Sequence, residues 1–281
     1  MSALVVALSV LALLLLAFSI SMAVNVSRLR TAKRQQGLSA PWRIPRKQPE
    51  ELDPVFAPGP YGPTLDTEVH FVGGGGANVR GGTTDVEAWV LAVLAKRATT
   101  LFEFGTCTGK TTYLWARNSP PHARVTTLTL APDEHGAYVA GADDDPRATG
   151  WALQESQFTR FLYTGTDVER KVTQLYGDSK AFDETPFVDS CDLIFVDGSH
   201  AYSYVVSDSR KALRMVRPGG IVLWHDYGGP AWAADVYRAL NELSEKIPLL
   251  HIAGTKLVAY RRPQTDGRGS TQNIDGESGR A

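Results

Sequence analysis

The sequence predicts an α/β domain built on a doubly wound, mostly parallel sheet, preceded by one transmembrane helix. Three observations support this prediction. Helical and strand patterns alternate from about residue 84 to residue 260, glycine-containing turns follow several short apolar strands, and the first residues of the chain are apolar and uncharged. Alternating elements of this kind are typical of sheets that carry helices on both faces.

The N-terminal segment is predicted to anchor the protein in a membrane. From Ala3 to Val24 the residues are apolar or small except for three serines, and no charge occurs before Arg28. A run of this length can cross a bilayer as a helix. The small residues at positions 21 and 23 leave a cleaved signal peptide as the alternative, although the segment lacks a basic start. Lys and Arg residues follow with no acid until Glu50, which predicts that the folded domain lies on the cytoplasmic side.

Composition and pattern divide the chain into four predicted parts. Residues 1–27 form the anchor, 28–63 a basic, proline-rich tether, 64–263 the folded domain, and 264–281 a disordered tail. The net charge of −1, without a basic stripe interleaved with aromatic residues, gives no support to nucleic-acid binding. Cys107 and Cys191 lie in apolar segments and are expected to be buried thiols. The oligomeric state stays open.

The elements of the folded domain follow in order. Residues 84–87 form a capping box, and apolar residues at 86, 89, 90, 93 and 94 predict an amphipathic helix to about Arg97. A strand is expected over 100–104, a helix over 111–117, and a strand over 124–130. Residues 134–168 are weakly patterned and longer than a crossover requires. This segment is either a lid or acceptor-binding insertion, or simple packing.

The second half of the domain continues the alternation. Strands are expected over 171–176, 192–196 and 221–224, and helices over 202–216 and 232–246. Two last apolar runs, 249–253 and 256–260, are close enough to form an antiparallel pair. In doubly wound sheets, ligands bind at the carboxyl ends of the strands. The residues that directly follow each strand are therefore the candidate site.

The turn after the first strand has two candidate ligands. Its glycines and the start of the next helix bring backbone N–H groups close to a ligand. Gly105-x-x-x-Gly109-Lys110-Thr111 nearly matches the P-loop for phosphate, but three residues separate its glycines where the P-loop has four. The other ligand is a nucleoside, whose polar groups would contact an acid placed before the first glycine, as Glu103 is. A purely structural turn is the remaining interpretation.

Later strand ends carry motifs that together resemble a known family. Gly177-Asp178-Ser179 and Asp197-Gly198-Ser199-His200 each follow a strand, and a Pro-Gly-Gly strand ends in Trp224-His225-Asp226-Tyr227. With these motifs the chain resembles the class I S-adenosylmethionine-dependent methyltransferases, which have a Rossmann-like fold. It is most similar to the bacterial branch akin to catechol and macrolide-sugar O-methyltransferases, whose first motif is E-h-G-x-x-x-G. The resemblance runs from Gly81 to Tyr260 and is strongest over Asp192–Tyr227.

The resemblance implies a set of residues that bind S-adenosylmethionine. Glu103, Gly105 and Gly109 would line the methionine side, Thr106 and Thr111 would add hydrogen bonds, Asp178 and Ser179 would lie by the adenine, and Asp197 would lie under the sulfonium. One position departs from the pattern. Relatives place an acid for the ribose hydroxyls where this chain has Thr129, so ribose binding is expected to be weaker or to use Asp133.

The resemblance also implies a metal and a base. Asp197 and Asp226 would hold a divalent cation such as Mg²⁺, which prefers oxygen ligands and could lower the pKa of a substrate hydroxyl. His200 and His225 are the candidates for general base, because histidine titrates near neutrality. The alternatives are that His200 caps a turn or contacts the cofactor and that His225 orients Asp226. Asp208 is predicted to be a solvated or structural acid.

The function implied is an O-methyltransferase that acts on a small hydroxylated acceptor, such as a sugar or a lipid-linked glycan beside the membrane. Two other classes stay open. A P-loop nucleotide hydrolase would bind ATP, and a non-catalytic, membrane-tethered nucleoside-binding module would keep the fold without turnover, a class that Thr129 favours. Binding of S-adenosylmethionine and of ATP separates these classes.

Overall fold

The computed structural model describes residues 42–57, 67–69 and 82–264, together with a helical stretch, 18–27, and Val5, Ala12, Leu15 and Leu16 ahead of it. Nearly half of the predicted anchor, residues 28–41 and 58–63 of the predicted tether, and residues 265–281 of the predicted tail lie outside the described residues. Within the described part of the chain, no helix combines the length and the apolar character that a bilayer crossing requires. The anchor therefore stays a prediction.

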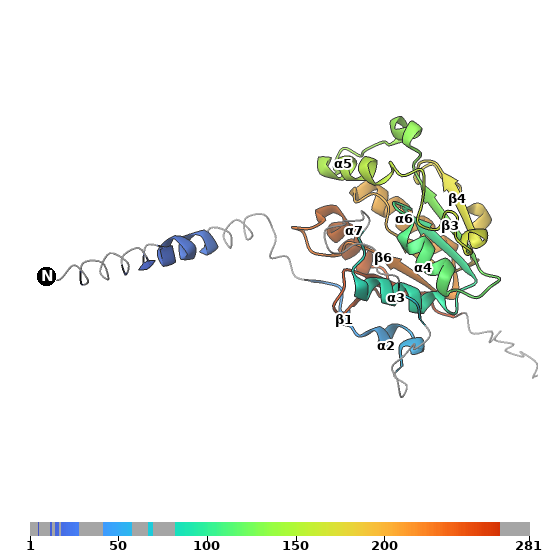
Figure 1. Cartoon of the computed structure of the whole chain (residues 1–281), viewed down its shortest axis with the longest axis horizontal. Coiled ribbons are helices and arrows are strands. Elements are labelled where there is room, and N and C mark those ends of the chain that lie inside the picture. The colour runs from blue at the N-terminus through green and yellow to red at the C-terminus, as the bar shows by residue number, and fades with distance from the viewer. Residues whose placement is uncertain are drawn as a thin grey trace, which may run out of the picture.

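The centre of the fold is a sheet to which the described residues contribute eight strands, in the order β1-β7-β8-β6-β5-β2-β3-β4 (Figure 1). The strands are β1 (Arg46–Lys47), β2 (Thr100–Phe104), β3 (Arg124–Thr129), β4 (Val172–Tyr176), β5 (Cys191–Val196), β6 (Val216–Trp224), β7 (Leu250–Ile252) and β8 (Val258–Arg261). Strand β8 runs antiparallel to β6 and β7, and the other neighbours are parallel. The predicted Rossmann-like, mostly parallel sheet with an antiparallel C-terminal strand is confirmed.

Helices cover both faces of this sheet. The longer ones are α3 (Asp85–Ala95), α4 (Lys110–Asn118), α5 (Pro146–Glu155), α6 (Tyr202–Met215) and α7 (Ala234–Ser244). Successive strand residues point to opposite faces. Accordingly, Leu101 of β2 packs in the same cluster as Val90 of α3 and Trp115 of α4, whereas Phe102 and Phe104 pack with residues of α6 and α7.

Helix α3 begins at the predicted capping box, but it is more deeply buried than its pattern suggested. Thr84 Oγ1 accepts from the backbone of Glu87, and Glu87 Oε2 accepts from the backbone of Thr84 at 2.8 Å. The predicted apolar face is partly wrong, because Val86 is 50% exposed while Leu91, outside that face, is fully buried. The helix is packed against α4 and the segment that ends at Phe56, as well as the sheet.

Strand β6 is longer than predicted. It begins at Val216 rather than Ile221 and includes Pro218, Gly219 and Gly220. The pairing of β5 with β6 shifts register between Cys191 and Leu193, opposite this insertion. A bulge lets glycine and proline remain in a strand that would otherwise end there.

Residues 42–57, which we call the N-terminal strap, are packed on the domain instead of forming a plain tether. The strap contains β1, which is parallel to β7, the short helix α2 (Pro49–Leu52) and a turn of 3₁₀-helix, η1 (Pro54–Phe56). Ile44, Leu52 and Phe56 are buried, and the indole of Trp42 stacks on His251 at 5.5 Å. The predicted extended tether is therefore wrong for these residues.

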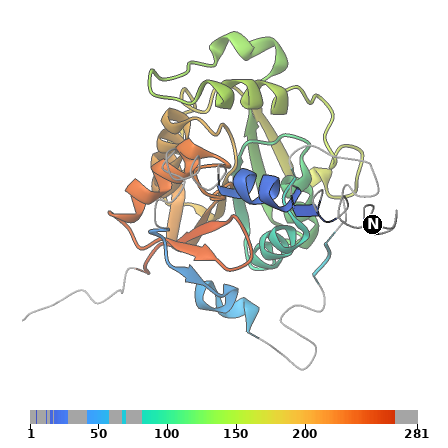
Figure 2. The ribbon, with the colours of Figure 1, turned by 90° about the vertical axis from the view of Figure 1, so that its left-hand side faces the viewer.

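The arrangement of strands places a crevice at the carboxyl end of β2. From β2 the chain continues outward to β3 and β4 on one side, and then returns to β5 and β6 on the other. Ligands of doubly wound sheets bind where the strand order reverses in this way. The insertion that carries η2 (Pro132–Ala137) and α5, green in Figure 2, spans the sheet at this end.

Candidate active site

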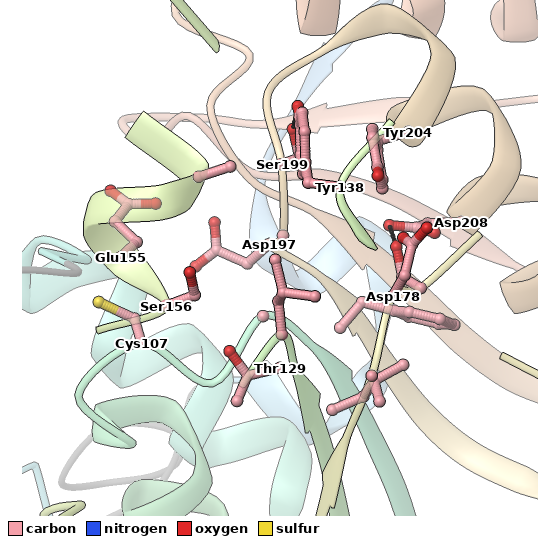
Figure 3. A pocket seen from close by; sticks show the side chains of 18 residues that line it. Cys107, Thr129, Tyr138, Glu155, Ser156, Asp178, Asp197, Ser199, Tyr204 and Asp208 are labelled. Carbon is pink, nitrogen blue, oxygen red and sulfur yellow. Dashed lines mark hydrogen bonds between the residues drawn. The ribbon is translucent and has the colours of Figure 1, made fainter. Parts of the chain in front are cut away.

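A pocket with about 560 Å³ of space, part of it open to solvent, lies at the reversal of strand order. Its wall is made by the carboxyl ends of β2 to β5, the first residues after them, and the insertion; the lining includes Phe104, Gly105, Cys107, Leu128, Thr129, Leu130, Tyr138, Ala152, Glu155, Ser156, Gly177, Asp178, Ser179, Asp197, Gly198, Ser199, Tyr204 and Asp208. Figure 3 shows Asp197 near the middle, with Cys107 and Glu155 to one side and Asp178 and Asp208 to the other.

The glycines of the first turn are required by close packing. Gly105 has a φ of +96°, and a Cβ there would lie 2.1 Å from the carbonyl oxygen of Asp197. Gly109 has a φ of +77°, and its Cβ would lie 2.9 Å from both Phe161 and Tyr163. L side chains rarely adopt such backbone angles. The end of β2 therefore touches the end of β5, and the insertion covers the start of α4.

This packing does not support the P-loop alternative. A P-loop needs open backbone N–H groups at the helix start and a lysine that reaches the phosphates. Here aromatic side chains pack on Gly109, and the backbone N–H of Leu162 donates to Thr108 O at 2.9 Å. The Nζ of Lys110 is turned to the carbonyl of Thr83 at 2.7 Å.

Glu103 lies behind the pocket wall. Its side chain is 1% exposed and accepts hydrogen bonds from the hydroxyls of Thr112 and Thr127, the latter at 2.7 Å. Burial raises the pKa of Glu103 to about 8, so the carboxyl is mostly neutral at pH 7. Of the residues predicted to contact the cofactor, four are absent from the described lining of the pocket: Glu103, Thr106, Gly109 and Thr111.

We expect Glu103→Gln to leave affinity for S-adenosylmethionine within about threefold of wild type, because the carboxyl is buried and mostly neutral. Titration calorimetry on both proteins measures this. A loss of affinity of about a hundredfold would instead support the direct contact between Glu103 and the cofactor that the sequence suggested.

The other predicted cofactor residues, Gly105, Thr129, Asp178, Ser179 and Asp197, line the pocket. Thr129 ends β3 at the place expected for a ribose contact, whereas Asp133 is not part of the described lining. Near Asp178, the rings of Tyr138 and Tyr204 stack at 4.5 Å. The sequence did not reveal this aromatic wall, because Tyr138 comes from the weakly patterned insertion.

Asp208 is also part of the wall, and it is not solvated. The residue is 1% exposed, and its Oδ2 accepts from Ser179 Oγ at 3.1 Å. Burial raises the pKa of Asp208 to about 7. Its position was visible in the sequence, because it lies three residues after Val205 and four before Ala212, on the apolar face of α6.

We expect Asp208→Asn to flatten the pH dependence of stability. A carboxyl whose pKa is raised by folding contributes stability at acid pH that is lost as pH rises through the folded pKa of about 7. The free energy of unfolding of the variant should therefore rise relative to that of wild type between about pH 4 and pH 8, by at most about 4 kcal/mol. Denaturant unfolding at several pH values measures it. Parallel curves for the two proteins would contradict the burial of a neutral acid.

Beside the pocket lies a group of ionisable side chains that we call the charged cluster: Glu87, Glu155, Asp197, His200, His225 and Asp226. His225 is its centre. Its Nδ1 lies 3.1 Å from Asp197 Oδ1 and 3.2 Å from Asp226 Oδ2, and its Nε2 lies 3.3 Å from Glu87 Oε2. His200 Nε2 lies 2.8 Å from Asp226 Oδ2. The motif residues predicted to act together therefore do meet.

The carboxylates around His225 favour its charged form. Burial lowers the pKa of His225, but the charges of Asp197 and Asp226 outweigh burial and leave it well above the ordinary value. Burial raises the pKa of Asp226, but His225 and His200 bring it well below its usual range. A protonated imidazole cannot take up a proton, so this arrangement favours His225 as the residue that orients Asp226 over His225 as the base.

His200 and Glu155 complete the cluster, and Glu155 also lines the pocket. Burial lowers the pKa of His200, but its hydrogen bond to Asp226 and the charge of Asp226 leave it raised. Burial raises the pKa of Glu155 to about 7. Cys107, which also lines the pocket, has a pKa raised by burial to about 12, as expected of an unreactive thiol.

Glu87 and Glu155 were missed by sequence reasoning. Glu87 is recognisable as a capping residue, and its second partners, His225 and the backbone N–H of Lys256 at 2.7 Å, lie far away in the sequence. Hydrogen bonds and the charge of His225 bring its pKa to about 2 against the effect of burial. Glu155 lies in the insertion, where the sequence offers no motif.

The donor set of the cluster suits a divalent cation. Asp197, His225 and Asp226 each offer a ligand atom, and these atoms all lie within 4.8 Å of one another. Two carboxylates are oxygen ligands of the kind that Mg²⁺ prefers. The side chains predicted as metal ligands thus lie close enough together to share one ion.

Comparison with known proteins agrees with this geometry. Residues 102–227 match the family model described as a methyltransferase domain. A search of curated proteins finds 33% identity over 52 residues with uncharacterized protein R132 of Acanthamoeba polyphaga mimivirus. That match covers 18% of this chain and 24% of the length of the mimivirus protein.

Solved structures with a similar fold include two methyltransferases. One is the O-methyltransferase TomG from Streptomyces achromogenes in complex with S-adenosylmethionine, with 19% identity, 64% of this chain and 82% of that chain covered, and a TM-score of 0.44. The other is methyltransferase PaMTH1 from Podospora anserina, bound to S-adenosylhomocysteine, with 16% identity, 65% and 80% covered, and a TM-score of 0.46.

The family match covers the residues that build the site, with the exception of Glu87. It begins within β2, before the Gly105 turn, and ends at Tyr227, directly after the charged cluster. Over these residues the chain is therefore similar to a methyltransferase domain, in agreement with the resemblance that its motifs suggested.

Proposed function

We propose that this protein transfers a methyl group from S-adenosylmethionine to a hydroxyl of a small acceptor. The observation that carries the proposal is that Asp197 belongs both to the pocket wall and to the charged cluster. Its side chain faces the pocket, and its Oδ1 also contacts His225 in the charged cluster. A cofactor in the pocket would thus present its sulfonium beside the carboxylates that can hold an acceptor.

The transfer itself needs positioning and removal of one proton. S-adenosylmethionine held in the pocket would supply the methyl group: the acceptor oxygen would form a bond to the methyl carbon as the carbon–sulfur bond breaks, and the electron pair would stay on sulfur as a neutral thioether. The hydroxyl proton passes to a carboxylate of the cluster. Glu155, with a pKa of about 7, lines the pocket and is suited to accept it. Alignment of the two reactants contributes much of the rate.

A divalent cation fits this scheme. Asp197 and Asp226, with His225 beside them, would hold it, and it would supply a lower pKa to a bound acceptor hydroxyl. Asp226 accepts from the indole of Trp232 at 2.7 Å, which fixes the orientation of its carboxylate.

Cofactor binding and turnover test the proposal on the full-length protein in detergent. Calorimetry should detect S-adenosylmethionine and give no heat with ATP. Release of S-adenosylhomocysteine should then depend on an added hydroxylated acceptor. Repeating this assay with added Mg²⁺ and with EDTA establishes the role of the cation. Binding without turnover across acceptors would favour the non-catalytic module that Thr129 suggests. Failure to bind S-adenosylmethionine at millimolar concentration would contradict both the methyltransferase and the non-catalytic module.

We propose also that residues 1–27 anchor the domain on the cytoplasmic side of a membrane. The support is the uncharged apolar run and the basic residues after it. In residues 18–27, which are helical, apolar side chains such as Phe18 and Ile20 are more than half exposed. Carbonate extraction of membranes and protease protection of vesicles test this. Release by carbonate would argue for the cleaved signal peptide.

A further inference from the structure

Two exposed tryptophans lie on one turn of the chain. Trp232, which precedes α7, is 54% exposed, and Trp42, the first residue of the N-terminal strap, is 48% exposed. A Cβ at Gly228 would lie 2.9 Å from the indole of Trp232, and a Cβ at Gly229 would lie 3.4 Å from the indole of Trp42. Because these glycines are consecutive, both indoles contact the same turn. Neither belongs to the described lining of the pocket, so the cofactor site does not account for them.

Both indoles are held in place from the inner side. The ring of Trp42 stacks on that of His251 at 5.5 Å and meets the ring of Tyr227 edge-on at 5.1 Å. The Nε1 of Trp232 donates to Asp226 Oδ1 at 2.7 Å. Each indole therefore presents a fixed apolar surface to the outside, and an exposed apolar surface of this kind is typical of a site of interaction.

The chain that leads to this turn is basic. Residues 28–47 contain seven Lys or Arg residues and no Asp or Glu. Within the strap, Arg43 and Lys47 pair with glutamates, and Arg46 is exposed between them. The cytoplasmic leaflet carries anionic lipids, which attract basic segments that follow a membrane helix. The charge of residues 28–47 thus complements that of a bilayer surface.

The proposed anchor keeps the turn within reach of a bilayer. Residues 28–41 connect residues 1–27 to Trp42, and they reach at most about 50 Å even when fully extended. Since Trp42 is packed on Gly229, the turn lies where the chain enters the domain. Tryptophan concentrates at the headgroup level of membranes, because its indole has an apolar body and one polar N–H.

We propose that Trp42 and Trp232 form a docking face that binds the headgroup region of a bilayer containing anionic lipids. This inference rests on the proposed membrane anchor and adds the face that the domain turns to the bilayer. The two indoles supply the apolar contact, and residues 28–47 supply attraction to the headgroups. The turn follows Asp226 and Tyr227 directly, so docking also fixes the position of the charged cluster relative to the bilayer.

The test measures tryptophan fluorescence of the full-length protein in vesicles of phosphatidylcholine and phosphatidylglycerol, with phosphatidylcholine brominated in its upper acyl chains as the quencher. Residues 1–41 contain no tryptophan, so quenching reports on the domain alone. Bromination should lower the emission of wild type. This decrease should fall to about half in Trp42→Phe or Trp232→Phe and disappear in the double variant, because each indole contributes to it. Phenylalanine keeps a ring against each glycine, so the variants retain the packing of the turn.

Trp151→Phe is the matched control, because this indole of α5 is 36% exposed and lies outside the docking face. It should keep the full decrease of wild type. A decrease that survives in the double variant, or that is lost in Trp151→Phe, overturns the docking face. Vesicles of phosphatidylcholine alone should give a smaller decrease, and an equal one would contradict the attraction assigned to the basic residues.

Two further measurements separate the docking face from the other proposals. Release of the wild-type protein from membranes by carbonate overturns the anchor and the docking face together. Retention in carbonate combined with emission that bromination does not change overturns the docking face only. Failure of the wild-type protein to bind S-adenosylmethionine in calorimetry contradicts the proposed methyl transfer, whereas the quenching result is independent of the cofactor.

Discussion

Replacement of Asp226 by asparagine is expected to lower turnover by about a hundredfold to a thousandfold, while affinity for S-adenosylmethionine stays near that of wild type. The carboxylate oxygens contact His200, His225 and Trp232. A neutral amide of the same size cannot balance two imidazoles, and its N–H groups would face other donors. Initial rates of S-adenosylhomocysteine release, with calorimetry of the cofactor, measure the two effects.

The backbone offers a matched control for this variant. Asp226 has a φ of +62°, and Asp189, far from the site, has a φ of +53°. Asparagine tolerates the left-handed region, so both substitutions should preserve the fold. Asp189→Asn should keep wild-type rates. Turnover of Asp226→Asn within tenfold of wild type would show that the charged cluster takes little part in the reaction.

Deletion of the N-terminal strap should have the largest effect on stability. Removal of residues 1–57 eliminates the buried side chains of Ile44, Leu52 and Phe56. At about 1.5–3 kcal/mol for each such side chain, the loss is about 5–9 kcal/mol, which is comparable to the total stability of many domains. Removal of residues 1–40 should leave melting close to that of the full chain. Calorimetric or fluorescence melting of the two truncated proteins gives the comparison.

A point substitution checks the same claim without changing the chain length. Phe56 is fully buried and its ring lies 5.3 Å from that of Trp89. Phe56→Ala should cost about 3–5 kcal/mol, whereas Val55→Ala, at a partly exposed neighbour, should cost less than about 1 kcal/mol. Equal melting of the two variants would mean that the strap adds little to the domain.

The sequence predicted the sheet well because its parallel strands are short apolar runs that alternate with helical periods. Strands 100–104 and 192–196 were placed within one residue of β2 and β5. The strap was missed for a physical reason. β1 has two residues and α2 has four, which is too short for a period to appear, and their stability comes from contacts more than 200 residues away, such as Arg261 with Asp53.

The site was predictable where chemistry follows a strand end. Asp178, Asp197 and Asp226 were found in this way, because carboxyl ends of parallel strands meet at one edge. The role of Glu103 was not predictable, since sequence order does not show that β3 brings Thr127 against it. Trp151 and Glu155 lie in an insertion whose placement depends on tertiary contacts, such as that of Asp144 with Ser203.

Strand β1 has a further consequence for how the protein behaves in solution. It occupies the outer side of β7, where the N–H groups of His251 and Ala253 donate to Pro45 and Lys47 at 2.8 Å. An uncovered edge of this kind is a template for strands of other molecules. The few residues of β1 thus act as a cover against self-association, and concentration-dependent light scattering should appear when they are removed.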